Sequence, residues 1–146
     1  AIGETNGNVN INVSGNSAAS SSIFAMGKVH EENAPESKFI NVEKVKLIKL
    51  DSIFDKYFSQ EKKYLLKIDV QGYEDNVLKG AINVIKKVDA IKIECSLTSL
   101  YEGDKTYEHY FEILQKNGFE LFDIDPGFSN PITGHLLQFD ALFVRN

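Results

Sequence analysis

The clearest hydrophobic pattern of the chain lies in its middle third. Residues 65–70, Leu-Leu-Lys-Ile-Asp-Val, are typical of a strand, and residues 90–95, Ala-Ile-Lys-Ile-Glu-Cys, are typical of a second strand. Between them, residues 74–87 follow the turn Gln71-Gly72 and place their apolar side chains at helical spacing. A strand, a helix and a strand over this length predict a βαβ unit with parallel strands and a right-handed crossover.

The amino-terminal third predicts two further strands and a short helix. Apolar residues alternate with asparagine and serine over residues 8–14, which is the period of a half-buried strand. A long polar connection follows over residues 15–38, and residues 42–48 predict a second strand. Asp51 is then expected to be the N-cap of a short helix over residues 52–59.

The carboxyl-terminal third predicts a helix over residues 105–117, which ends at Asn117-Gly118. Strands are expected at residues 119–124 and 137–144, and because no helix separates them we expect them to pair antiparallel. The elements together predict an α/β fold: one domain with a mixed sheet, at least one parallel pair of strands and an antiparallel edge. No internal repeat is evident.

The composition of the chain argues against several classes of function. The chain has 146 residues, 42% of them hydrophobic and 25% charged, which suits a single globular domain. A net charge of −5 argues against a nucleic-acid partner. A single cysteine, Cys95, excludes an internal disulfide, and no Cys/His cluster predicts a metal site. Without a long apolar run or a leader, we expect no membrane partner and a cytoplasmic location.

The carboxyl ends of the two parallel strands are where a sheet of this kind binds ligands. Lys67 and Asp69 share one face of the first strand, and Lys92 and Glu94 share one face of the second. One interpretation is a pair of site carboxylates, held ionised by the lysines, that accept a substrate proton or bind an ammonium group. The other is an ion-pair lattice across the strands, or capping of the following helix by Asp69. The spacing does not decide between them.

Other chemistry-bearing residues carry weaker signals. Glu74 lies in the first turn of the predicted helix, where a carboxylate suits the helix dipole and free backbone amides. Cys95 is expected to be a small buried hydrophobe, and Tyr101 is expected in the core, with a pocket position as the alternative. The three histidines share no ligand spacing, and of them only His135, in a turn, is a candidate for ligand contact.

Several ordered motifs together resemble one known family. The segment LLKIDVQGYEDNVLKGA, residues 65–81, is similar to the signature of the FkbM family of S-adenosylmethionine-dependent methyltransferases. The resemblance continues through AIGETNGNVNINVS, SSSI and LIKLDSIF before it, and through IKIECSLTSLYEGD, NGFELFDI and LLQFDALFVR after it. The similarity therefore extends over nearly the whole chain.

The resemblance implies a Rossmann-like class I methyltransferase sheet whose last strand is antiparallel. It also implies that residues 1–146 are the carboxyl-terminal part of a single FkbM-type domain. The family's first strands, with a glycine motif and an acidic residue that bind the cofactor, have no counterpart here, and the chain begins with Ala1 rather than methionine. We therefore expect a partial sheet.

The resemblance also implies roles for individual residues. Asp69 and Glu94 correspond to catalytic positions, near the transferred methyl group and the acceptor. Ile2 and Gly3 correspond to a loop beside the cofactor's adenine, and Asp69 and Gln71 are expected to contact the cofactor as well. Ser21 and Ser22 match a serine pair without an assigned role.

The expected function is transfer of a methyl group from S-adenosylmethionine to a hydroxyl of a sugar or natural product. A small-molecule or glycan acceptor and self-association through an exposed sheet edge are the expected partners. The alternative is a non-catalytic α/β module that does not bind the cofactor by itself. A metal-dependent hydrolase built on Asp69 and Glu94 lacks further ligands at suitable spacing.

Overall fold

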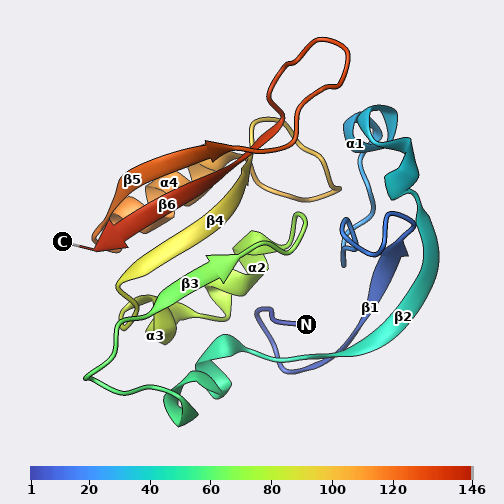
Figure 1. Cartoon of the computed structure of the whole chain (residues 1–146). Helices are drawn as coiled ribbons and strands as arrows, with labels where there is room; N and C mark the ends of the chain where they lie inside the picture. Colours follow the sequence, from blue (N-terminus) through green and yellow to red (C-terminus); the bar gives the residue numbers. More distant parts are fainter. Residues whose placement is uncertain (146) are drawn as a thin grey trace.

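The computed structural model describes residues 1–145 and shows an α/β body beside a two-stranded ribbon (Figure 1). Its strands are β1 (Gly7–Ser14), β2 (Phe39–Leu47), β3 (Leu65–Ile68), β4 (Ala90–Ser96), β5 (Phe119–Pro126) and β6 (Gln138–Arg145). Its α-helices are α1 (Lys28–Asn33), α2 (Glu74–Lys79), α3 (Ile82–Ile85) and α4 (Tyr107–Lys116). Single 3₁₀ turns lie at Pro35–Ser37, Leu50–Ser52 and Phe54–Lys56. The longest described helix has ten residues, so no helix within residues 1–145 could span a bilayer.

The main sheet has the strand order β3-β4-β6-β5. β3 and β4 are parallel, with Leu65 opposite Ala90, whereas β6 pairs antiparallel with both β4 and β5. The predicted parallel pair and the antiparallel pairing of the last two strands are both confirmed. The fold is therefore mixed α/β and Rossmann-like, as predicted.

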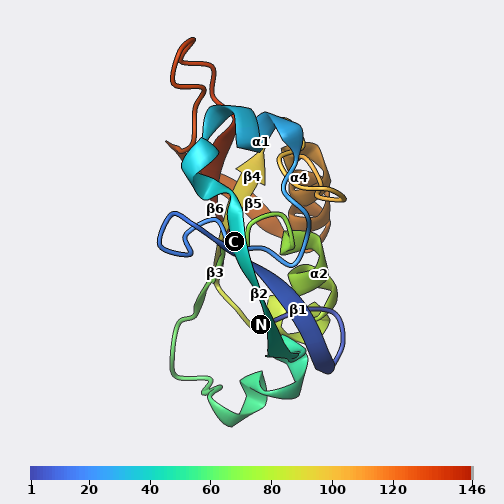
Figure 2. The same cartoon turned by 90° about the vertical axis from the view of Figure 1, so that its right-hand side faces the viewer.

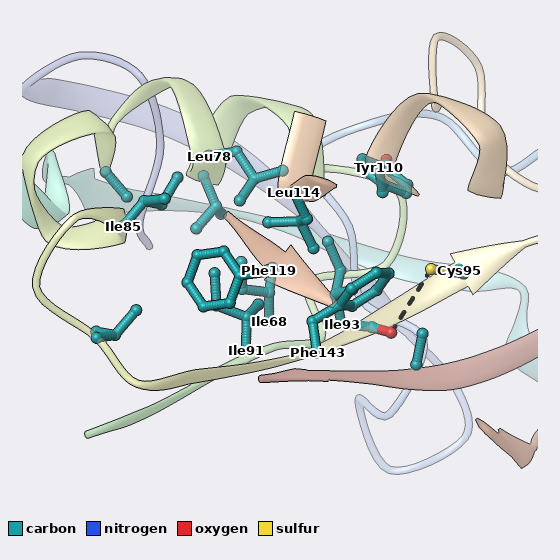
Figure 3. Packing of buried hydrophobic residues seen from close by; sticks show 14 of the residues in the cluster. Ile68, Leu78, Ile85, Ile91, Ile93, Cys95, Tyr110, Leu114, Phe119 and Phe143 are labelled. Carbon is teal, nitrogen blue, oxygen red and sulfur yellow. Dashed lines mark hydrogen bonds between the residues drawn. The ribbon is translucent and has the colours of Figure 1, made fainter. Parts of the chain in front are cut away.

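One face of this sheet forms the hydrophobic core. Ile91, Ile93 and Cys95, which are alternate residues of β4, are completely buried against the helices, and Leu114 of α4 packs on the same cluster (Figure 3). Burial of one such large aliphatic side chain stabilises a fold by about 1.5–3 kcal/mol. This packing fixes the positions of β3 and β4, and therefore the positions of the residues that follow them.

The opposite face of the sheet is polar. Lys67, Lys92, Glu94 and Asp140 alternate with the core residues along β3, β4 and β6, so they lie on this face. Figure 2 shows α2 and α4 together on the other side of the sheet. On the polar face Lys67 keeps access to water, whereas Glu94, which shares a cavity with His30 of α1, is largely buried.

The β1–β2 ribbon is a separate antiparallel pair that runs from Gly7 opposite Leu47 to Ser14 opposite Phe39. Both strands were predicted, although β2 begins at Phe39, earlier than residue 42. The long connection between them contains α1, and it folds back so that Ser22 and Asn12 exchange backbone hydrogen bonds of 2.8 and 3.1 Å. This return brings the serine-rich segment to the end of β3.

The predicted continuous helix over residues 74–87 is wrong, because the chain breaks at Gly80 between α2 and α3. A Cβ at Gly80 would lie 2.0 Å from the carbonyl oxygen of Gly3, so only glycine fits where the amino-terminal segment packs against the end of α2. Ile82, one of the apolar residues of the predicted helix, is 57% exposed.

The predicted helix over residues 52–59, with Asp51 as its N-cap, is also wrong. Asp51 lies within a 3₁₀ turn, and its carboxylate accepts hydrogen bonds of 3.0 Å from the backbone N–H groups of Asn83 and Val84. Asp51 therefore caps α3, whose free amides it satisfies. Asp51 is a capping residue, as predicted, but it caps a different helix. The amide of Asn83 that it accepts from lies 32 residues further along the chain.

Candidate active site

The loop after β3 has an unusual backbone. Gln71 has a φ of +56° and Gly72 a φ of +94°, so two successive residues adopt left-handed conformations. Gly72 is required there, because a Cβ would lie 2.7 Å from the Cβ of Tyr101. A non-glycine residue in this conformation is typical of turns at functional sites.

Two side chains hold this loop in place. The carboxylate of Glu74 accepts hydrogen bonds from the backbone N–H groups of Val70 (3.1 Å) and Gly72 (3.2 Å). Burial raises the pKa of Glu74 to about 7, although these bonds act in the opposite direction. The hydroxyl of Ser22 donates a 2.6 Å hydrogen bond to the carbonyl oxygen of Gln71. Hydrogen bonds with Glu74 and with Ser22 therefore hold the backbone of this loop in place.

The Gln71 side chain joins the ends of β3 and β4. Its Nε2 donates to Asp69 Oδ1 at 3.1 Å and to Glu94 Oε2 at 2.9 Å. Its Oε1 accepts a hydrogen bond of 2.8 Å from the Tyr101 hydroxyl. Gln138 of β6 donates to the same oxygen of Glu94 at 3.0 Å. Asp69 and Glu94 are thus brought together by one amide.

The two carboxyl groups have opposite electrostatic environments. Burial acts to raise the pKa of Asp69, but hydrogen bonds from Lys67 (2.8 Å) and Gln71 outweigh it and hold this pKa below its ordinary value. Burial raises the pKa of Glu94 to about 8, and the charges of neighbouring carboxylates raise it further. Near pH 7 Asp69 is a carboxylate and Glu94 is a carboxylic acid.

The expectation that lysines hold both carboxylates ionised is therefore wrong for Glu94. Lys92 pairs with Asp140 (3.2 Å) of the adjacent strand β6 and with Asp125 (2.8 Å) of β5, the strand beyond it. A cross-strand ion-pair lattice thus exists, but it lies beside the Asp69–Glu94 pair. Asp69 does not cap α2 either, since the N-cap residue of that helix is Tyr73 and no side chain caps it there.

Two cavities meet at Gln71. The first, which we call the Asp69 cavity, has a volume of about 320 Å³, and its lining includes Ile2, Ile11, Ser21, Asp69, Gln71 and Tyr73. The second, the Glu94 cavity, has a volume of about 280 Å³, and its lining includes Asn16, Ser20, His30, Ser37, Glu94 and Gln138. Gln71 lines both, so its side chain lies at the junction between them.

The structure brings most of the proposed site residues together. Ile2, Asp69 and Gln71, the expected cofactor contacts, line the Asp69 cavity, and Glu94 lines the adjoining cavity. Gly3 is buried beneath this surface, where a Cβ would lie 2.9 Å from both Leu47 and Tyr73. Gly3 thus supports the cavity wall rather than lining it.

Two residues at the site were not predicted as site residues from the sequence. Gln138 and His30 come from segments far from β3 along the chain, and nothing in their spacing relates them to Gln71. The matched serine pair has a structural role here: Ser21 accepts a hydrogen bond from the Ser14 amide (3.1 Å), and Ser22 fastens Gln71. Tyr101 is completely buried, as its core interpretation predicts; its hydroxyl bonds Gln71, but Tyr101 itself is not in the lining of either cavity.

The remaining candidates lie outside the two cavities. Cys95 is completely buried in the core, and burial raises the pKa of its thiol to about 12, which leaves it unreactive. His109 bonds Asp75 at 2.8 Å, and His135 is exposed in a loop. Among residues 1–145 no three histidine, cysteine or carboxylate side chains gather in a metal-binding arrangement.

The sequence of this chain matches the profile of a known protein family. The profile described as "Methyltransferase FkbM domain" matches residues 1–121. These residues include Asp69 and Glu94, which lie at the strand ends beside the two cavities. Comparisons with curated proteins and with solved structures give no significant match. Because the family profile covers most of the chain, the protein belongs to the FkbM methyltransferase domain family.

Proposed function

We propose that this domain transfers a methyl group from S-adenosylmethionine to a hydroxyl group of a sugar or natural product. The observation that carries the proposal is a carboxylate and a carboxylic acid joined by Gln71 at the junction of two cavities. Two reactants that must meet need two adjoining spaces with catalytic groups between them. Membership of a methyltransferase family agrees with this arrangement.

The Asp69 cavity suits the cofactor. Ile2, Ile11 and the ring of Tyr73 offer an apolar wall for a heterocycle, and the Asp69 carboxylate offers a negative charge. When bound, S-adenosylmethionine supplies a methyl group on a positively charged sulfonium. We assign Ile2, Asp69 and Gln71 as the residues that contact it, with Gly3 as their support.

The acceptor hydroxyl would lie between Asp69 and Glu94. Asp69, ionised by Lys67 and Gln71, accepts the hydroxyl proton at a carboxylate oxygen. Glu94, protonated near neutral pH, donates a hydrogen bond that orients the acceptor. The electrophile is already activated, so these residues contribute mainly alignment and removal of one proton.

Calorimetric titration of S-adenosylmethionine into this chain tests the proposal. Because residues 1–146 contain no glycine motif of the kind that the resemblance implies, we expect weak binding, with a Kd on the order of 1 mM. Asp69→Asn should weaken binding about tenfold, whereas Asp123→Asn, on exposed β5, should leave it unchanged. Absence of binding would instead favour the alternative, a non-catalytic α/β module.

A further inference from the structure

The Tyr101 hydroxyl lies behind the Gln71 turn, outside both cavities. Tyr101 is completely buried and is not in the lining of either cavity. Its hydroxyl donates a hydrogen bond of 2.8 Å to Oε1 of Gln71 and lies 3.3 Å from the carbonyl oxygen of Ser20. A hydroxyl has a single proton to donate, and the shorter distance identifies Gln71 as its main acceptor.

Contacts that do not involve Gln71 hold Tyr101 in place. The backbone N–H groups of Leu100 and Tyr101 donate to Oδ2 of Asp104 at 2.9 and 3.2 Å. The Tyr101 ring packs edge-on against His30, with ring centroids 5.1 Å apart. Tyr101 is therefore a fixed group against which the longer and more flexible side chain of Gln71 is oriented.

The two ends of the Gln71 amide face groups of opposite hydrogen-bonding character. Asp69 is a carboxylate, which only accepts hydrogen bonds, so the amide nitrogen Nε2 must face it. Oε1 then faces Tyr101, whose hydroxyl is its one donor among the described residues. Without this hydroxyl Oε1 would lack a donor in its present position, and the amide would lose the contact that fixes its orientation.

We propose that Tyr101 is a positioning residue for methyl transfer, and that its hydroxyl acts through Gln71 by holding Nε2 toward both Asp69 and Glu94. A hydrogen bond donated to Oε1 polarises the amide and strengthens the bonds that its N–H groups donate. These bonds favour the ionised form of Asp69, which is the form that accepts a proton. The inference rests on the proposed function only for the rate of transfer, since the effect on Asp69 can be measured without cofactor or acceptor.

Titration of the Asp69 carboxyl carbon by ¹³C NMR tests this effect. Tyr101→Phe keeps the buried ring but removes the hydroxyl, and the pKa of Asp69 should rise because a hydrogen bond that lowers it is no longer held. Tyr110→Phe is the matched control. Tyr110 is also buried (Figure 3), but its hydroxyl has no hydrogen-bond partner within residues 1–145, so its removal should leave Asp69 unchanged. Equal titration of Asp69 in Tyr101→Phe and the original chain would overturn the proposal.

The titratable groups around Asp69 do not explain such a difference. They are Lys67 on the same strand, Glu94 on β4 and Glu74 on α2, and neither substitution changes them. Gln71→Met gives a further check, because it removes the amide through which Tyr101 is proposed to act. In that background Tyr101→Phe should not move the Asp69 titration any further. A further shift of the same size would show that Tyr101 does not act through Gln71.

Turnover measures the consequence for methyl transfer. Tyr101→Phe should lower kcat about tenfold and change KM for S-adenosylmethionine by less than about twofold, since Tyr101 lines neither cavity. The acidic limb of the pH–rate profile should move to higher pH together with the NMR titration of Asp69. Tyr110→Phe should keep the original kcat and profile. An unchanged kcat in Tyr101→Phe, or a loss confined to KM, would reject the positioning role.

The outcomes separate this inference from the proposed function. A shifted Asp69 titration without methyl transfer to hydroxyl-bearing acceptors would support the link from Tyr101 to Asp69 and reject the proposed function. Transfer at the original rate in Tyr101→Phe would retain the function and reject the role of Tyr101. If Tyr101→Phe does not fold, the original chain still decides, because the Nε2 resonances of Gln71 should shift as Asp69 is protonated. Nε2 resonances that do not follow Asp69 would overturn the proposal.

Discussion

Gln71 combines a strained backbone with a central side-chain position. Its left-handed φ of +56° turns the chain sharply after β3, and its amide then reaches both Asp69 and Glu94. Ser22 and Tyr101 hold the same residue through its carbonyl oxygen and its Oε1. Because surrounding contacts fix this conformation, the two carboxyl groups keep one relative orientation.

Asp69 should be the residue on which turnover depends most. Asp69→Asn removes the group that accepts the hydroxyl proton, and we expect methyl transfer to slow by about 10²-fold or more. The measurement is turnover with labelled S-adenosylmethionine and a hydroxyl-bearing acceptor. Asp123→Asn is the control. Unchanged turnover in Asp69→Asn would remove Asp69 from this role.

Glu94 should make stability depend on pH. Its folded pKa of about 8 lies above its ordinary value, so the folded state holds a proton that the unfolded state releases. Stability from this group is present at low pH and is lost as pH rises towards 8. Glu94→Gln should remove up to about 1.4 kcal/mol per pH unit of that dependence between about pH 5.5 and 7.5. Urea unfolding measures it; identical slopes in both proteins would contradict the assignment.

At the residue scale, the sequence identifies the strand-end carboxyl groups but not their protonation states. Asp69 and Glu94 follow from the rule that ligands bind beyond the ends of parallel strands. Lys67 and Lys92 occupy equivalent positions in the pattern, yet only Lys67 pairs with a site carboxylate, because Lys92 faces two aspartates from β5 and β6. That difference arises from the strand order β4-β6-β5 and its register, which the sequence does not reveal.

Among the elements, the break between α2 and α3 decides how the amino-terminal segment reaches the site. Gly80 allows the backbone of Gly3 to pack against the helix end, and Ile2 then lies at the Asp69 cavity. The Gly3 amide also donates a 3.1 Å hydrogen bond to the Ile48 carbonyl oxygen. The ribbon and the α/β body are therefore joined where the cofactor is proposed to bind.

Asp51 should contribute to stability as the cap of α3. Asp51→Ala leaves the amides of Asn83 and Val84 without their acceptor and should lower the free energy of unfolding by about 1–2 kcal/mol. Asp55→Ala, in the same segment, removes only an exposed ion pair with Lys87 and should change stability by less than about 1 kcal/mol. Urea unfolding of both variants checks this; an equal loss in the two would count against the cap.

Strands were easier to predict than helices in this chain. Each predicted strand exists. In β4 the alternating apolar residues are the buried ones, whereas β5 is exposed at all but its first residue and was indicated by its composition and flanking turns. The helix errors at residues 52–59 and 74–87 share one cause, since Asp51 and Gly80 make contacts with distant segments that override local preference.

At the scale of the whole molecule, the sheet is one-sided. Helices α2, α3 and α4 cover the core face, whereas β3 forms an edge on which Leu65 is 61% exposed. An exposed edge strand is a site for pairing with another chain, so self-association remains an expectation. The location of the two cavities at the ends of β3 and β4 agrees with a Rossmann-like ligand site.

The most direct test of the account is where S-adenosylmethionine binds. We predict that adding about 10 mM cofactor to the ¹⁵N-labelled chain shifts the backbone amide resonances of Ile2, Ser22 and Gln71, which line the Asp69 cavity. The competing location is the apolar groove lined by Leu78, Ile82 and Ile113, between α2, α3 and α4. Shifts confined to that groove, or no shifts at all, would contradict the assignment of the Asp69 cavity as the cofactor site.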